Sequence, residues 1–127
     1  MHESQTQTTI IVVPCFNEAK RLPTRELLDF IGSCEHISFI LVNDGSTDDT
    51  GSVIVRLCNA NPRRISAIHL RQNAGKAEAV RSGMIKALQS RPAYVGYWDA
   101  DLSTPLWEID RLSSFMEKNA NLKAVFG

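Results

Sequence analysis

The stretch TIIVVPCFNE, residues 9–18, passes from a β-branched apolar run to a proline followed by mostly polar residues. The run is short and almost continuously apolar, which predicts a strand buried on both faces of a parallel sheet. Four more runs of this kind follow, and the starts of the five lie 28, 28, 29 and 28 residues apart. This spacing suits successive strand–helix–strand units. The expected strands are 9–13, 37–42, 65–70, 94–98 and 122–126.

The segments between these runs carry apolar residues three and four positions apart, which is the helical period. Thr104 followed by Pro105 predicts an N-cap with proline at the first position of the fourth helix. The alternation predicts an α/β fold, with an open, mostly parallel, Rossmann-like sheet and helices on both faces. The apolar faces are expected at Leu27, Leu28 and Ile31; at Val53, Ile54, Leu57 and Cys58; at Ala77, Val80, Met84 and Leu88; and at Leu106, Ile109, Leu112 and Met116.

Length and charge limit the kinds of partner. A chain of 127 residues fits one domain, which we expect over 9–127 after a polar tail at 1–8. The 14 basic and 14 acidic residues cancel, so we expect no broad basic surface for nucleic acid or an anionic membrane. Three scattered cysteines without a CxxC pair favour a reducing cytoplasm. The chain shows no signal peptide and no run long enough to span a membrane.

The chemically unusual residues follow the predicted strands, whereas the loops that lead into the strands are bland. Residues 14–18, 43–49, 71–76 and 99–101 stand at the four strand ends. Ligands of open parallel sheets bind outside the carboxyl ends of the strands. We therefore expect these four loops to form one binding site.

Asp99 and Asp101 directly follow the fourth strand. Residues two apart in a strand share a face, so both carboxylates can point the same way. Like charges this close call for a cation, and oxygen ligands suit Mg²⁺ or Mn²⁺, which take further ligands from water and phosphate. The alternative is a pair of solvated or helix-capping aspartates. The position at the shared edge favours the metal site.

Residues at the ends of the first two strands leave two interpretations open. Asp44 can accept a hydrogen bond from a base or a ribose, or Gly45 and the residues after it can simply form a turn and helix cap. Pro14 redirects the chain, after which Phe16 either packs against a base or sugar or joins the core. Glu18 adds another acceptor at this end.

Gly75 and Lys76 open the third helix, where free N–H groups and a positive charge can meet a phosphate. The spacing is not that of a P-loop, and no GxGxxG occurs. Arg81 fits a solvated surface position. No histidine or nucleophile stands in a catalytic arrangement, so the sequence assigns no catalytic residue.

Four motifs carry a family resemblance: IIVVPCFNEAKRL, ILVNDGSTDDT, NAGKAEAVRSGM and WDADLSTP. In this order and at this spacing they resemble family 2 glycosyltransferases of the GT-A type. The polyprenyl-phosphate (dolichyl-phosphate) mannosyl- and glucosyltransferases are the most similar group. The resemblance covers residues 10 to about 126 and implies the GT-A fold with strand order 3-2-1-4.

The resemblance also implies roles for single residues. The donor would be a UDP- or GDP-hexose, the acceptor a polyprenyl phosphate, and transfer would proceed with inversion. Mg²⁺ or Mn²⁺ would be held by Asp99 and Asp101 against the diphosphate. The implied nucleotide-binding residues are Pro14, Phe16, Glu18, Val42, Asp44, Gly75, Lys76, Asp99 and Ala100.

Some positions depart from the pattern of the group. Ser103 stands where relatives often carry a metal-binding glutamine, Asn43 replaces the first aspartate of the usual DDGS, and Glu78 would face a diphosphate unless it points away. The chain also ends where relatives continue into their acceptor half, so we expect a truncated domain with that half absent. We expect it in the cytoplasm or at the cytoplasmic face of a membrane.

Two alternatives belong to other classes. The chain could bind a nucleotide sugar without turnover, because the acceptor half is absent. It could instead be a sugar nucleotidyltransferase, but that class needs a glycine-rich loop ending in Arg or Lys soon after the first strand. The residues 14–18 do not provide such a loop.

Overall fold

The computed structural model describes residues 8–101 and 105–118. Four parallel strands form one sheet in the order β3-β2-β1-β4, which confirms the predicted order 3-2-1-4. The predicted cap at Thr104 and fifth strand at 122–126 lie outside the described residues. The strands are β1 Thr9–Cys15, β2 Ile37–Asp44, β3 Ile65–Leu70 and β4 Tyr94–Tyr97; the helices are α1 Thr24–Ser33, α2 Thr50–Ala60, α3 Lys76–Gln89 and α4 Trp107–Lys118.

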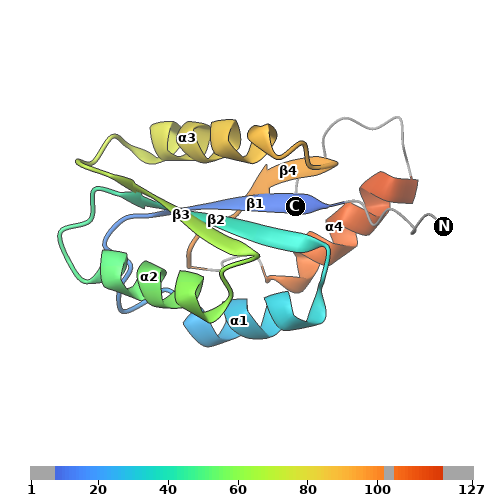
Figure 1. Cartoon of the computed structure of the whole chain (residues 1–127), viewed down its shortest axis with the longest axis horizontal. Helices are drawn as coiled ribbons and strands as arrows, with labels where there is room; N and C mark the ends of the chain where they lie inside the picture. Colours follow the sequence, from blue (N-terminus) through green and yellow to red (C-terminus); the bar gives the residue numbers. More distant parts are fainter. Residues whose placement is uncertain (1–7, 102–104, 119–127) are drawn as a thin grey trace.

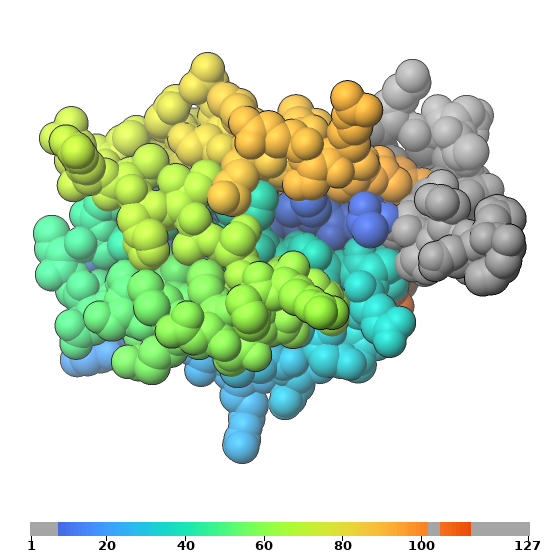
Figure 2. Space-filling model, viewed as in Figure 1, coloured from blue at the N-terminus to red at the C-terminus, as the bar shows by residue number. Residues whose placement is uncertain are grey.

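The sheet is covered on both faces, as the apolar runs predicted (Figure 1). Alternate residues of a strand point to opposite faces. Ile11 and Val13 of β1 therefore pack in the cluster that includes α1, α2 and α4, whereas Ile10 and Val12 pack in the cluster that includes α3. In the space-filling view a small patch of blue atoms from the β1 segment is visible between the orange atoms above it and the cyan atoms below it (Figure 2). Among the described helices none has both the length and the apolar composition needed to cross a membrane.

The buried face of α3 differs from the predicted one. Ala77 is exposed and Leu88 is 62% exposed, so neither belongs to the core. The residues that α3 buries fully are Ala79, Gly83 and Ala87, while Met84 of the predicted face packs, partly buried, against the same cluster. Small side chains let the helix axis approach the sheet closely, and a pattern of large apolar residues does not mark such a face.

Gly83 marks a close contact between α3 and the sheet. A methyl group added there would overlap Val12 and lie 3.1 Å from Val42 Cγ2. Overpacking of this kind typically costs about 1–3 kcal/mol. We therefore expect Gly83→Ala to lower the free energy of unfolding in urea by about that amount, despite the better helix propensity of alanine.

Gly32 in α1 provides the matched control, because no described atom lies within 4 Å of a methyl group added there. Gly32→Ala should be neutral or stabilise by up to about 1 kcal/mol. Equal stability of the two variants would contradict the close packing of α3.

The carboxylate of Asp44 joins the end of β2 to the loop before α3. Asp44 is 3% exposed, and its Oδ1 accepts a hydrogen bond from Ala74 N at 2.8 Å. Its Oδ2 accepts from Gly75 N at 3.1 Å and from Asn73 Nδ2 at 3.0 Å. Gly45 follows with φ +66, and a side chain there would overlap the backbone of this loop. The start of α3 is thereby fixed beside the end of β2.

Asp44→Asn tests this junction. The new amide group would present a donor to backbone N–H groups that now have an acceptor, and it would remove the charge that strengthens those bonds. We expect a loss of about 2 kcal/mol or more in the free energy of unfolding, measured by urea denaturation at fixed salt.

Asp49→Asn makes the same chemical change nearby. Asp49 is the exposed N-cap of α2 and makes no side-chain capping bond, so its loss should cost at most about 1 kcal/mol through the helix dipole. If both variants lost the same stability, Asp44 would have no special role.

Candidate functional site

The loops after the strands enclose a cavity of about 550 Å³ at the carboxyl edge of the sheet. All the predicted site residues except Val42 line it, and so do Cys15 and Asn73, to which the sequence assigned no binding role. The convergence follows from strand order, because β1 lies between β2 and β4. The lining residues are Pro14, Cys15, Phe16, Glu18, Asp44, Asn73, Gly75, Lys76, Asp99, Ala100 and Asp101.

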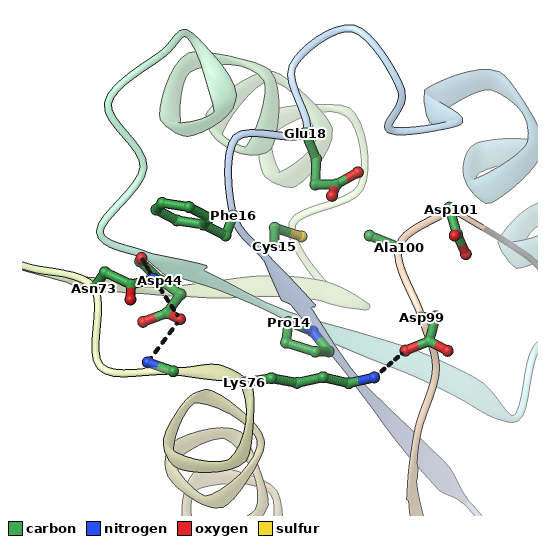
Figure 3. A pocket seen from close by; sticks show the side chains of 11 residues that line it. Pro14, Cys15, Phe16, Glu18, Asp44, Asn73, Lys76, Asp99, Ala100 and Asp101 are labelled. Atoms are coloured by element: carbon green, nitrogen blue, oxygen red, sulfur yellow. Dashed lines mark hydrogen bonds and ion pairs between the residues drawn. The ribbon is translucent and has the colours of Figure 1, made fainter.

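The cavity has two chemically different ends (Figure 3). Phe16, Asp44 and Asn73 lie at one end. Asp99 and Asp101 lie at the other, and the Lys76 side chain extends along the cavity towards Asp99. One end therefore offers an aromatic ring and hydrogen-bonding groups, and the other offers charge.

Val42 does not reach this cavity. Its side chain is fully buried in the cluster beneath α3. The nucleotide-binding role that the resemblance implies for Val42 is therefore not supported by this geometry. Val42 precedes the end of β2 by two residues, so it lies within the covered part of the sheet, while Asp44 reaches the edge.

Hydrogen bonds hold the loop after β1 against the loop before α2. Asn17 N donates to Ser46 Oγ at 3.0 Å, and Thr47 N donates to Asn17 Oδ1 at 2.9 Å. Glu18 N donates to Thr50 Oγ1 at 2.8 Å. Asn17 adopts φ 51, a left-handed conformation that asparagine tolerates. Ser46, Thr47 and Thr50 therefore position the loop that carries Phe16 and Glu18, which the turn-and-cap interpretation did not include.

The capping part of that interpretation fits Asp48. Its Oδ1 accepts a hydrogen bond from Thr50 N at 2.9 Å and one from Thr50 Oγ1. The bond from the Thr50 hydroxyl is the main cause that lowers the pKa of Asp48. Asp48 thus stays ionised at the start of α2 and orders the threonine that holds Glu18.

The ring of Phe16 and one carboxylate oxygen of Glu18 are available to a ligand in the cavity. Phe16 is 42% exposed, which settles the open choice against a place in the core. Glu18 Oε1 accepts from Arg21 Nη2 at 3.2 Å, while its Oε2 is buried and has no hydrogen-bond partner among the described residues. Buried oxygens are normally hydrogen-bonded, so a ligand that supplies a donor fits this position.

Cys15 lies in the cavity wall but is not a nucleophile. Burial, and secondarily the charge of Glu18, raises its pKa to about 12. Its thiol donates to Val13 O at 3.5 Å. Only a thiolate attacks carbon or binds metal readily, so Cys15 contributes shape and apolar surface.

The charged end contains an ion pair. Lys76 Nζ lies 2.6 Å from Asp99 Oδ1, and these side chains are 58% and 46% exposed. The same Nζ lies 5.6 Å from the centre of the Tyr97 ring. The hydrogen bond to Asp99 is the main cause that raises the pKa of Lys76, which favours the charged form of the lysine.

Asp99 and Asp101 fit a magnesium or manganese ion by their chemistry. Both carboxylates line the cavity and provide only oxygen ligands. Among the described residues no third acidic, histidine or cysteine side chain completes a group that could hold a metal alone. The remaining ligands would come from water and a bound molecule. Ser103, at the position of the expected glutamine, lies outside the described residues.

Comparison with curated proteins finds similar sequences among lipid-linked sugar enzymes. Over 121 residues the chain is 30% identical to a polyprenol monophosphomannose synthase of Mycolicibacterium smegmatis, covering 92% of the chain and 44% of that protein. It is 32% identical to a mouse dolichyl-phosphate beta-glucosyltransferase, covering 87% of the chain and 36% of that protein. The chain thus spans less than half the length of these relatives.

Solved structures share the fold. A mannosyltransferase from Pyrobaculum calidifontis, in complex with GDP-Man and Mn²⁺, aligns with a TM-score of 0.60 and 26% identity over 77% of the chain and 28% of that protein. S. aureus TarS aligns with a TM-score of 0.66 and 18% identity over 94% of the chain and 38% of that protein. These likenesses confirm the predicted GT-A fold.

The family model for glycosyl transferase family 2 matches residues 10–125, nearly the whole chain. That range contains all four motifs and every residue that lines the cavity. The chain belongs to glycosyl transferase family 2.

Proposed function

We propose that the cavity binds a nucleoside diphosphate hexose together with Mg²⁺ or Mn²⁺, and that the whole protein transfers the hexose to an acceptor with inversion. The observation that carries this proposal is the division of one cavity into an aromatic, hydrogen-bonding end and a charged end. A nucleoside diphosphate has the same division. The GDP-Man and Mn²⁺ complex of the Pyrobaculum mannosyltransferase supports it by analogy.

The base and ribose would occupy the end with Phe16. The exposed ring offers a face on which a base or sugar can stack. Asp44 accepts three hydrogen bonds from the chain, and an ionised carboxylate has about four acceptor positions. One position is therefore left for a base N–H. Glu18 Oε2 can accept a second donor from the nucleoside.

The diphosphate would lie between the acidic pair and the start of α3. Asp99 and Asp101 would hold the metal, with the Ala100 backbone close by. Once bound, the metal would neutralise charge on the leaving diphosphate. Lys76 and the N–H groups at the start of α3 would add positive charge there. Glu78 pairs with Arg81 at 3.3 Å on the exposed side of α3, which reduces its repulsion of a diphosphate.

The proposed acceptor is a polyprenyl phosphate. The names of both curated relatives, a polyprenol monophosphomannose synthase and a dolichyl-phosphate beta-glucosyltransferase, refer to a lipid of this kind. An acceptor phosphate oxygen would attack the anomeric carbon as the bond to the diphosphate breaks, which inverts the configuration at that carbon. The phosphate is already anionic and needs no general base. This fits the described residues, to which we assign no catalytic base. The reaction would then take place at the cytoplasmic face of a membrane.

Binding without turnover is the second candidate function for this chain alone. The chain spans 44% and 36% of the two curated relatives, and residues that bind an acceptor have not been identified in it. Assays of donor hydrolysis and transfer, with this chain and with a longer one, distinguish the two candidates.

A calorimetric titration tests the proposed donor site. UDP-glucose and GDP-mannose are each added with and without Mn²⁺, and we expect one of them to bind at least about tenfold more tightly with the metal, because the metal screens the diphosphate from the acidic pair. The double variant Asp99→Asn with Asp101→Asn should lose this metal dependence.

The control for the double variant is Glu108→Gln, since Glu108 pairs with Arg111 on α4 outside the cavity lining. It should bind like the wild type. Failure of both nucleotide sugars to bind with metal, or metal dependence that persists in the double variant, would refute the site assignment.

A further inference from the structure

We propose that Lys76 competes with the divalent cation for Asp99, so that metal binds more tightly when a diphosphate releases the lysine. This inference rests on the proposed function, because it concerns the same acidic pair and diphosphate. It assigns Lys76 a second state in addition to a phosphate contact. In the structure the ammonium group of Lys76 binds the Asp99 oxygen that the divalent cation would need.

The position of the lysine is imposed by the fold. Lys76 is the first residue of α3 and follows Gly75, whose φ is +99. The N–H of Gly75 is bound by the buried carboxylate of Asp44, so the backbone beside the lysine cannot move away. From this fixed point the side chain extends to Asp99 on the far side of Pro14 (Figure 3). The pair is therefore a consequence of strand order and the Asp44 junction.

The pair directly occupies an oxygen that a metal would need. Nζ lies 2.6 Å from Asp99 Oδ1, a distance typical of a direct hydrogen bond between charged groups. An ammonium and a divalent cation repel each other, so both cannot share this oxygen. Metal binding without any other ligand must therefore break the pair and leave the lysine charge beside the metal.

The exposure of the pair sets the size of the effect. Side chains that are 58% and 46% exposed form an ion pair with a small net stabilisation, equivalent to about fivefold or less in an equilibrium constant. The pair is strong enough to weaken metal binding measurably and weak enough to be replaced. The ion pair therefore weakens metal binding without preventing it.

A diphosphate changes the balance for both cations. Its oxygens provide the further ligands that Mg²⁺ or Mn²⁺ requires, and they provide Lys76 with a new anionic partner in the same cavity. Metal and nucleotide would then each raise the affinity of the other by the same factor, since coupling free energies are reciprocal. Part of that coupling would come from Lys76.

The test compares Lys76→Gln, Lys76→Arg and the control Lys86→Gln, which removes the same charge from an exposed position further along α3. Binding of Mn²⁺ alone is measured by electron paramagnetic resonance at low salt. We expect Lys76→Gln to bind Mn²⁺ up to about fivefold more tightly than the wild type. Lys76→Arg keeps the cation and should resemble the wild type, as should Lys86→Gln. Adding Asp99→Asn to Lys76→Gln should remove the gain.

The second arm measures UDP and GDP, each with saturating Mn²⁺, by calorimetry. The nucleotide that binds should bind more weakly to Lys76→Gln than to the wild type, so that one substitution changes the two affinities in opposite directions. A lysine that only stabilises the fold would not produce opposite changes. Unchanged or weaker binding of Mn²⁺ alone by Lys76→Gln, or undiminished nucleotide binding, would overturn the proposal.

The two arms also separate this proposal from the donor-site proposal. If no nucleotide binds to the wild type but Lys76→Gln still gains Mn²⁺ affinity through Asp99, the proposed function fails and the competition between lysine and metal stands. If nucleotide and metal bind together but Lys76→Gln gains no affinity for Mn²⁺ alone, the competition is refuted and the donor site stands.

Discussion

The buried carboxylate of Asp44 is the interaction on which the geometry of the site depends. It stands at the end of β2 and accepts hydrogen bonds from Asn73, Ala74 and Gly75. A buried charge is tolerated only when it is paired or hydrogen-bonded. The loop before α3 provides three hydrogen bonds to the carboxylate, and these bonds fix the backbone of the loop at the cavity. These hydrogen bonds fix the start of α3 and so place Lys76 opposite Asp99.

Strand order provides the second half of the site. The strand order reverses at β1, because β2 and β3 lie on one side of it and β4 on the other, and the loops after β1 and β4 line one cavity. Such switch points are where open α/β sheets bind ligands. The acidic pair after β4 therefore faces the loop after β1 that carries Phe16, although more than 80 residues separate the two in the chain. Metal and nucleoside positions are brought together by topology.

Much of this could be predicted from the sequence, because periodicity and strand-end motifs are local signals. The four described strands, their parallel order and the convergence of Asp44, Lys76 and Asp99 all follow such signals. Packing was harder to predict. The apolar run of β2 predicted the burial of Val42, which argues against the nucleotide-binding role implied by the resemblance. The small-residue face of α3 was not indicated, since it depends on how closely the helix approaches the sheet. The Lys76–Asp99 pair joins distant residues, so no local pattern could show it.

Paramagnetic relaxation by Mn²⁺ tests the central claim, that nucleotide and metal meet at the carboxyl edge of the sheet. Amide signals of the ¹⁵N-labelled chain are recorded with UDP or GDP while Mn²⁺ is added in small amounts. The account predicts that Gly75 and Ala100, which line the cavity, broaden first, while Ile65 and Ala93 at the opposite edge stay sharp. Broadening centred on the opposite edge, or spread evenly over the chain, would contradict it.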